Sequence, residues 1–130
     1  MKKLILLLMT GFSLLTFSQE PIFTAKYMQI CEFDYDEDDY IINDKDWINT
    51  ELETSKEYAI FKLEGEETKI WWEFNEEESN DNYSVYYTEN NIDKFVFDYT
   101  EEKIYMFSEY NNSTNQYDEL LILSKITVEE

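Results

Sequence analysis

The feature that most constrains this chain is its division into short segments in which apolar and polar residues alternate. In one such segment Ile70, Trp72 and Phe74 share one parity, while Lys69 and Glu73 take the other. A period of two is typical of a β-strand with one buried face. The segments recur at spacings of roughly 10–14 residues with short polar connections, which favours hairpins between successive strands. The pattern therefore predicts an all-β chain.

We expect a small antiparallel meander of about seven or eight strands. Two architectures would bury its apolar faces, namely an up-and-down barrel and a two-layer sandwich. The barrel is preferred, because neighbouring strands are joined by hairpin-length turns and no long crossover is evident. In general shape such a chain resembles the small exported barrels related to lipocalins. The Gly-x-Trp motif that opens true lipocalins is absent, so the resemblance is one of architecture.

Several strands can be placed from the pattern. Gly65, the only glycine after residue 18, predicts a hairpin turn between two apolar runs. The stretch 40–43 is expected to be a short strand, and 44–56 to be a strand or irregular. A last strand, at 120–126, is apolar on both faces, which is typical of a central or interior strand. A first strand is expected to carry six residues on one face: Phe23, Ala25, Tyr27, Gln29, Cys31 and Phe33.

The N-terminus has the features of a secretory signal peptide. Lys2 and Lys3 precede a mostly apolar run at 4–15, and Thr16 and Ser18 place small residues at a cleavage site. We expect residues 1–18 to be removed after Ser18, leaving a single all-β domain at 19–130 that is secreted or periplasmic. The alternatives are an N-terminal anchor or a buried helix, for which the apolar run is short.

Charge excludes several classes of function. The chain has 30 acidic residues, 10 lysines, no arginine and no histidine. Residues 19–130 hold 8 of those lysines and all 30 acidic residues, a net charge of −22. Such a surface repels nucleic acid and anionic membranes, so neither is an expected partner. Without histidine there is no Ser-His or Cys-His nucleophile pair and no zinc site of the usual histidine type.

A single cysteine cannot form a disulfide within the chain. Cys31 lies in the alternating first strand beside Phe33, so it is expected in the core. A link between two chains and a free thiol are the alternatives.

The stretch 34–39, DYDEDD, is the candidate metal site. Asp34, Asp36 and Asp38 are spaced like positions one, three and five of a calcium-binding loop. Position six is Asp39 where the loop needs glycine, and position twelve is Lys45 where it needs glutamate. The remaining hypotheses are a solvated acidic turn, a protein-contact surface, and a weak calcium site formed by these four aspartates. Apart from this calcium, no cofactor is expected.

Nothing in the sequence predicts an enzyme. With 30 carboxylates, some pair will lie at glycosidase spacing in any fold, which is uninformative. Ser55-Lys56 and Ser124-Lys125 are neighbours, and neighbours on a strand point to opposite faces. By the same parity Trp72 is expected in the core and Trp71 on the opposite, more polar face. There the indole of Trp71 either anchors a ligand or a partner, or covers the barrel mouth or packs under a loop. Trp47 has the same ambiguity.

Two binding functions follow from these observations. In the first, the barrel interior holds a small apolar or aromatic ligand; the candidate ligand-binding residues are Trp47, Trp71, Trp72, Phe97 and Met106. In the second, the acidic exterior captures a cationic protein or peptide, as small exported inhibitors of lysozyme do. Electrostatic steering would make such binding fast and dependent on salt.

Overall fold

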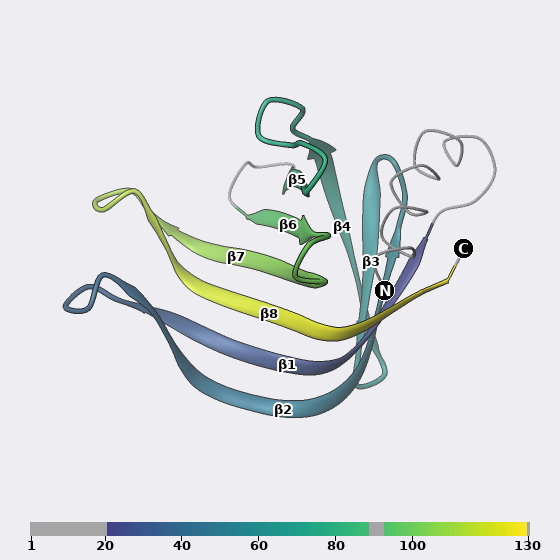
Figure 1. Cartoon of the computed structure of the whole chain (residues 1–130), viewed down its shortest axis with the longest axis horizontal. Coiled ribbons are helices and arrows are strands. Elements are labelled where there is room, and N and C mark those ends of the chain that lie inside the picture. Colours follow the sequence, from purple (N-terminus) through teal and green to yellow (C-terminus); the bar gives the residue numbers. More distant parts are fainter. Residues whose placement is uncertain (1–20, 89–92, 130) are drawn as a thin grey trace.

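The chain forms a closed eight-stranded antiparallel barrel in which each strand pairs with its neighbours in sequence and β8 pairs with β1 (Figure 1). The computed structural model describes residues 21–88 and 93–129. The strands are β1 (Ile22–Asp34), β2 (Asp39–Thr54), β3 (Tyr58–Leu63), β4 (Glu66–Phe74), β5 (Tyr83–Thr88), β6 (Lys94–Asp98), β7 (Lys103–Asn111) and β8 (Gln116–Glu129). The predicted all-β meander is confirmed, as the barrel and not the sandwich.

The expected leader, residues 1–18, and its cleavage site after Ser18 lie outside the described residues. Within the described ranges there is no helix of the length and apolarity needed to cross a membrane.

The tight turns use left-handed backbone conformations. At the predicted β3–β4 hairpin, Glu64 and Gly65 have φ values of 50° and 84° between the paired residues Leu63 and Glu66. Two successive positive φ values characterise a type I′ turn, whose twist matches that of the flanking strands. Only one of the two positions has glycine. Left-handed residues other than glycine are Asp38, Glu64, Glu102, Glu109, Asn115 and Lys125.

Strand β2 differs from the prediction. The sequence indicated a short strand at 40–43 followed by an ambiguous stretch, whereas Asp39–Thr54 is one continuous strand. Its pairing with β1 shifts register between Ala25 and Tyr27, and again between Ile30 and Cys31. Bulges of this kind let a strand stay paired while the alternation of its side chains is interrupted, so the pattern in sequence looks broken.

The barrel interior is filled by apolar side chains, many of them aromatic. Its buried members are Phe23, Ala25, Leu52, Ala59, Trp72, Tyr86, Phe95, Phe97, Tyr99, Ile104, Leu123 and Ile126. The side chains of Met28, Met106 and Leu121 are partly buried and pack against this cluster. Burial of this apolar area is the main stabilising contribution, since the described part of the chain has no disulfide.

The expectation that 23–33 presents a single apolar face is wrong. Phe23 and Ala25 belong to the interior cluster, and so does Met28 as a partly buried neighbour. Residues 25 and 28 differ in parity, so the pleat changes phase between them, at the register shift. Cys31 is buried, as predicted, with 2% of its surface exposed, but it lies outside the interior cluster.

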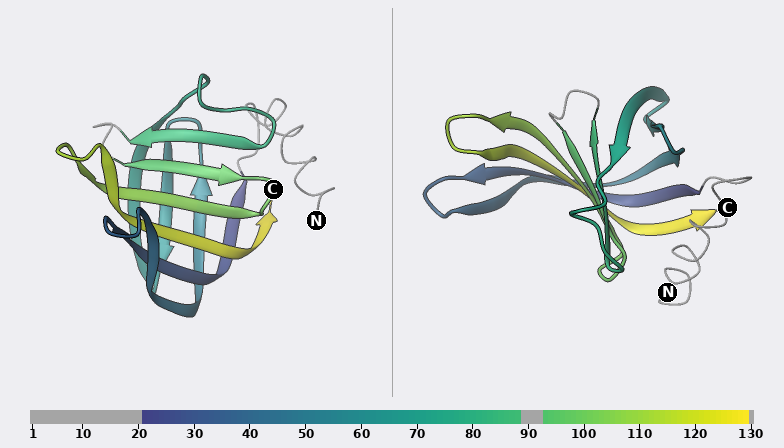
Figure 2. Two further views of the ribbon diagram at one scale, coloured as in Figure 1. Left: turned by 60° about the vertical axis from the view of Figure 1, so that its left-hand side comes forward. Right: turned by 90° about the horizontal axis from the view of Figure 1, so that it is seen from above.

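Two hairpins extend past the rest of the barrel. Only residues 50–54 of β2 pair with β3, and only residues 103–107 of β7 pair with β6. The hairpin ends, residues 28–48 and 106–121, form a four-stranded sheet in the order β2-β1-β8-β7, which we call the flare. Of its residues, Met106 and Phe107 still pair with β6. Figures 1 and 2 show both hairpins reaching past the ends of β3–β6.

Candidate functional site

The predicted interior residues are packed against the protein's own rings. Trp72 stacks on Tyr86 with ring centroids 4.2 Å apart. The ring of Phe97 meets the same indole edge to face, with ring centroids 5.9 Å apart. The indole Nε1–H of Trp72 donates a hydrogen bond of 3.0 Å to the carbonyl oxygen of Ser55. Trp72 is 3% exposed, so its predicted place in the core is confirmed. These contacts fix the orientation of the indole and occupy the space beside it.

The two other predicted tryptophans are exposed. Trp71 is 46% exposed, and Lys69 Nζ lies 4.4 Å from its ring centroid. Trp47, on β2, is 68% exposed and contacts Tyr27 with ring centroids 4.9 Å apart. The outward orientation predicted for Trp71 is therefore confirmed. The five candidate ligand residues do not converge, because Trp72, Phe97 and Met106 face the interior cluster while Trp47 and Trp71 are exposed to solvent.

The acidic stretch 34–39 forms the turn between β1 and β2. One carboxylate oxygen of Asp34 accepts hydrogen bonds from the backbone N–H groups of Asp36 and Glu37, at 2.9 and 3.3 Å. Asp39 similarly accepts from the N–H of Tyr40. These contacts are typical of aspartate in a turn. In the described part of the chain no group of three or more acidic or cysteine side chains is placed to hold a metal ion. The weak calcium site stays a prediction.

The outer face of the flare carries a second apolar cluster. Cys31 on β1 pairs with Leu120 on β8, and both are buried although neither belongs to the interior cluster. The rings of Tyr40 and Phe107 lie 6.0 Å apart although β2 and β7 are separated by two strands. The flare is therefore curled toward its outer face, over Cys31 and Leu120.

Hydrogen bonds join the two hairpin ends on this side. The phenol of Tyr40 donates to the carbonyl oxygen of Tyr117 at 2.6 Å. The phenol of Tyr35, in the acidic turn, donates to the carboxylate of Asp118 and contacts the hydroxyl of Thr114 at 2.9 Å. Burial raises the pKa of Tyr40 to about 12, with a smaller contribution from the nearby Tyr35. Tyr40 is therefore a neutral donor at physiological pH.

The opposite, inner face of the flare is arranged in rows that the strand register defines. One row is Asp46, Met28, Leu123 and Ile104; the next is Asp44, Ile30, Leu121 and Met106; the outermost is Ile41, Glu32, Glu119 and Ser108. Apolar side chains thus occupy the middle of this face, with carboxylates along the β2 side and at the outer end. Ile30 and Ile41 are 39% and 44% exposed.

Sequence reasoning missed this face. A parity count from Cys31 places Met28, Ile30 and Glu32 on the side opposite Phe23 and Ala25, so it predicts that they point away from the interior. Their actual place on the inner face depends on the phase change between Ala25 and Tyr27, where the register shifts. A sequence signal was present in Ile30 itself, since it is a large apolar residue at a position that the alternation assigned to solvent.

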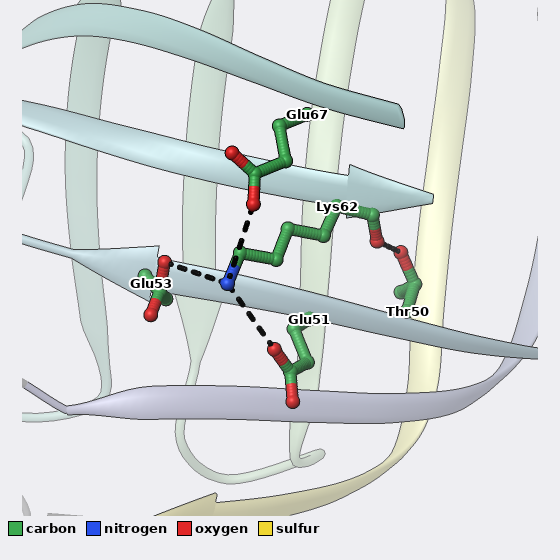
Figure 3. A network of polar contacts seen from close by, with 5 residues as sticks. All are labelled: Thr50, Glu51, Glu53, Lys62 and Glu67. Carbon is green, nitrogen blue, oxygen red and sulfur yellow. Dashed lines mark hydrogen bonds and ion pairs between the residues drawn. The ribbon is translucent and has the colours of Figure 1, made fainter. Parts of the chain in front are cut away.

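Two lysines form ion pairs away from the flare. Lys62 Nζ lies 3.1 Å from Glu53, 3.6 Å from Glu67 and 3.8 Å from Glu51 (Figure 3). The hydrogen bond to Glu53 raises the pKa of Lys62. Lys94 forms an ion pair with Glu78 at 3.6 Å. Over residues 21–88 and 93–129, no ion pair involves a carboxylate of the flare's inner face.

In comparisons with known proteins, no family model, no curated protein and no solved structure matches this chain.

Proposed function

We propose that this protein is a non-catalytic binding protein whose acidic exterior captures a cationic protein or peptide. The observation that carries the proposal is the distribution of charge. The sequence has 30 acidic residues against 10 lysines. In the described part of the chain, ion pairs use only Lys62 and Lys94 on the positive side, with four glutamates opposite them. Most carboxylates thus face solvent without a basic neighbour, which creates a strong negative field.

The interior offers less support for a ligand. Trp72, Tyr86 and Phe97 contact one another in stacked and edge-to-face geometry, and each is buried. A ligand among these rings would have to displace contacts that are each worth about 0.5–1.5 kcal/mol beyond the burial of area. The small apolar or aromatic ligand therefore stays a prediction, and the exterior is the surface that the geometry favours.

Export is part of the proposal. The basic residues Lys2 and Lys3, the apolar run and the small residues before Gln19 support a cleaved leader, so the partner would be met in the periplasm or outside the cell. N-terminal sequencing of the protein recovered from the periplasm and the medium of a bacterial culture tests this. A mature chain beginning at Gln19 is expected, and recovery of the chain only in the cytoplasm with Met1 retained would contradict it.

Association kinetics test the capture of a cationic partner. Lysozyme and cytochrome c serve as cationic probes, with an acidic serum albumin as the control. We expect binding to the cationic probes at low salt. The association rate should fall about tenfold or more between about 10 mM and about 0.3 M sodium chloride, because salt screens the field of the acidic surface. Absence of binding to both cationic probes at low salt, or an affinity that salt leaves unchanged, would overturn the proposal.

A further inference from the structure

We propose that the inner face of the flare is the docking surface, and that its occupant is a basic segment of another protein with both lysine or arginine and apolar side chains. This inference rests on the proposed function and adds to it where the partner binds and what it must carry. The surface is defined by Met28, Ile30, Glu32, Ile41, Asp44, Asp46, Met106, Glu119 and Leu121.

Beyond the residues that pair with β3 and β6, no further strand of the described chain covers this sheet face. β3 pairs with β2 only at residues 50–54, and β6 pairs with β7 no further than Phe107. Because the sheet curls toward its outer face, the side chains of the inner face are spread apart. Ile30 and Ile41 are consequently exposed by 39% and 44%. Exposed isoleucines that are grouped on one face and bordered by polar residues are typical of an interaction site.

Negatively charged side chains surround these apolar residues. Asp44 and Asp46 border the face along β2, and Glu32 pairs directly opposite Glu119 across β1 and β8. Like charges placed directly opposite one another in a sheet are destabilising. Asn43 donates one hydrogen bond of 2.7 Å to Glu32, and no lysine of the described chain forms an ion pair with either glutamate. A cation brought by a partner would relieve the repulsion.

The exposed apolar residues and the carboxylates around them together determine which kind of partner can bind. A second copy of this chain would bring the same carboxylates and a net charge of −20 at pH 7, so it would be repelled. A purely apolar partner would leave the carboxylates without compensation. A segment with both apolar and cationic side chains satisfies both parts of the face. Met28 and Met106 add adaptable side chains, which suit partners of varied sequence.

The inner face of the flare is already ordered in the unbound protein. The hydrogen bonds from Tyr40 to Tyr117 and from Tyr35 to Asp118 join the ends of the two hairpins from the outer side. A surface that is already ordered loses less conformational entropy when a partner binds. The stabilising contacts lie on one face of the sheet, which leaves the other face available.

Two synthetic peptides of equal length and equal net charge test the inference with the full protein. One alternates leucine and lysine, and the other alternates glycine and lysine. Isothermal titration at low salt should show the leucine peptide binding about tenfold more tightly, because it alone can bury Ile30 and Ile41. Replacing both residues (Ile30→Ser with Ile41→Ser) should remove that difference and leave binding of the glycine peptide unchanged.

The matched control uses the residue beside Ile41. Ile42 is 53% exposed and pairs with Cys31, so it lies on the outer face. Ile42→Ser should leave the affinity for both peptides within about twofold of the wild type. Equal effects of Ile41→Ser and Ile42→Ser, or an unchanged preference for the leucine peptide in the Ile30/Ile41 variant, would overturn the docking surface.

Charge variants give a second and independent readout. Glu32→Gln with Glu119→Gln should weaken both peptides more than Glu76→Gln with Glu77→Gln, which removes the same charge from the exposed β4–β5 connection. Equal weakening by the two pairs would support capture by the general field and overturn this location. If neither peptide binds the wild type at low salt, the proposed function itself fails.

Discussion

The phenol of Tyr40 on β2 donates a hydrogen bond of 2.6 Å to the backbone carbonyl oxygen of Tyr117 on β8, across the intervening strand β1. In a flat sheet such strands lie about 10 Å apart, so the tyrosine side chain extends over β1 to make this contact. The hydrogen bond thus stabilises the curl of the flare, which brings the Tyr40 and Phe107 rings together. Cys31 and Leu120 are buried beneath it.

Removing this hydroxyl should loosen the flare and leave the barrel intact. Tyr40→Phe keeps the ring contacts with Phe33 and Phe107 and loses one hydrogen bond, for an expected cost of about 0.5–1.5 kcal/mol in the free energy of unfolding. Urea denaturation measures the total, and amide exchange locates it at the hairpin ends. Tyr83→Phe, at an exposed phenol, is the control. Equal costs for the two variants would contradict the role given to Tyr40.

Much of the fold could be predicted because local patterns decide it. Alternation in 69–74 assigned Trp72 to the core and Trp71 to the opposite, more polar face, and both assignments are confirmed. Gly65 marked the β3–β4 turn, since a type I′ hairpin needs positive φ. Hairpin-length connections then favoured a meander, which the structure closes into a barrel.

The flare could not be predicted in the same way. Its two faces are distinguishable only when the register shifts near Tyr27 and Cys31 are known, and a bulge has no reliable sequence signature. The left-handed residues Glu109 and Lys125 are of types that seldom take positive φ, so they gave no bulge signal either. The inner face, where Ile30 lies between Asp44 and Leu121, became visible only through cross-strand pairing.

The three tryptophans should differ sharply in their effect on stability. Trp72→Ala removes a buried indole that contacts Tyr86, Phe95 and Phe97, which should cost about 3–5 kcal/mol. Trp71→Ala and Trp47→Ala, at exposed indoles, should each cost about 1 kcal/mol or less. Urea titration followed by circular dichroism makes the comparison. If Trp72→Ala does not fold, Trp72→Phe still loses the donor to Ser55. A Trp47 or Trp71 variant as damaging as the Trp72 variant would contradict the assignment.

Buried tyrosines should make the protein sensitive to alkali. Burial raises the pKa of Tyr99 to about 12, and burial raises the pKa of Tyr86 as well. An unfolded tyrosine has a pKa of about 10, so between about pH 10 and 12 the unfolded chain has lost protons that the native chain keeps. Stability is then fully present below about pH 10 and falls as pH rises, by up to about 1.4 kcal/mol per pH unit for each such tyrosine.

The Tyr86→Phe variant measures the contribution of one tyrosine to this loss of stability with rising pH. The ring stack on Trp72 is retained while the titrating phenol is removed. Urea midpoints at pH 9, 10 and 11 should fall less steeply for this variant than for the wild type. Parallel pH profiles would show that the alkaline loss arises elsewhere.

Divalent cations should distinguish a metal site from a screened turn at 34–39. Since Asp34 already accepts two backbone hydrogen bonds within the turn, we expect calcium and magnesium at matched ionic strength to raise the melting temperature by the same small amount. Thermal melts with each ion and with chelator measure this. A shift of roughly 10 °C with calcium alone, abolished by Asp36→Ala with Asp38→Ala, would instead establish the calcium site.

Lys62 is the one lysine of the described chain that lies within 4.0 Å of three carboxylates, those of Glu51, Glu53 and Glu67 (Figure 3). Lys62→Met keeps an apolar stem over the sheet but removes the cation that Glu51 and Glu53 on β2 share with Glu67 on β4, so the like charges of these glutamates repel one another. The variant should melt at a lower temperature than Lys56→Met, a control at an exposed turn that removes the same charge.

Because screening weakens repulsion between exposed charges, the difference in melting temperature between the two variants should shrink in concentrated sodium chloride, while the wild type itself gains stability. Thermal melts of all three proteins in dilute and concentrated salt measure both effects. A difference that persists at high salt would mean that Lys62 acts through its packing over β2 and β4, and a wild type insensitive to salt would mean that self-repulsion contributes little to its stability.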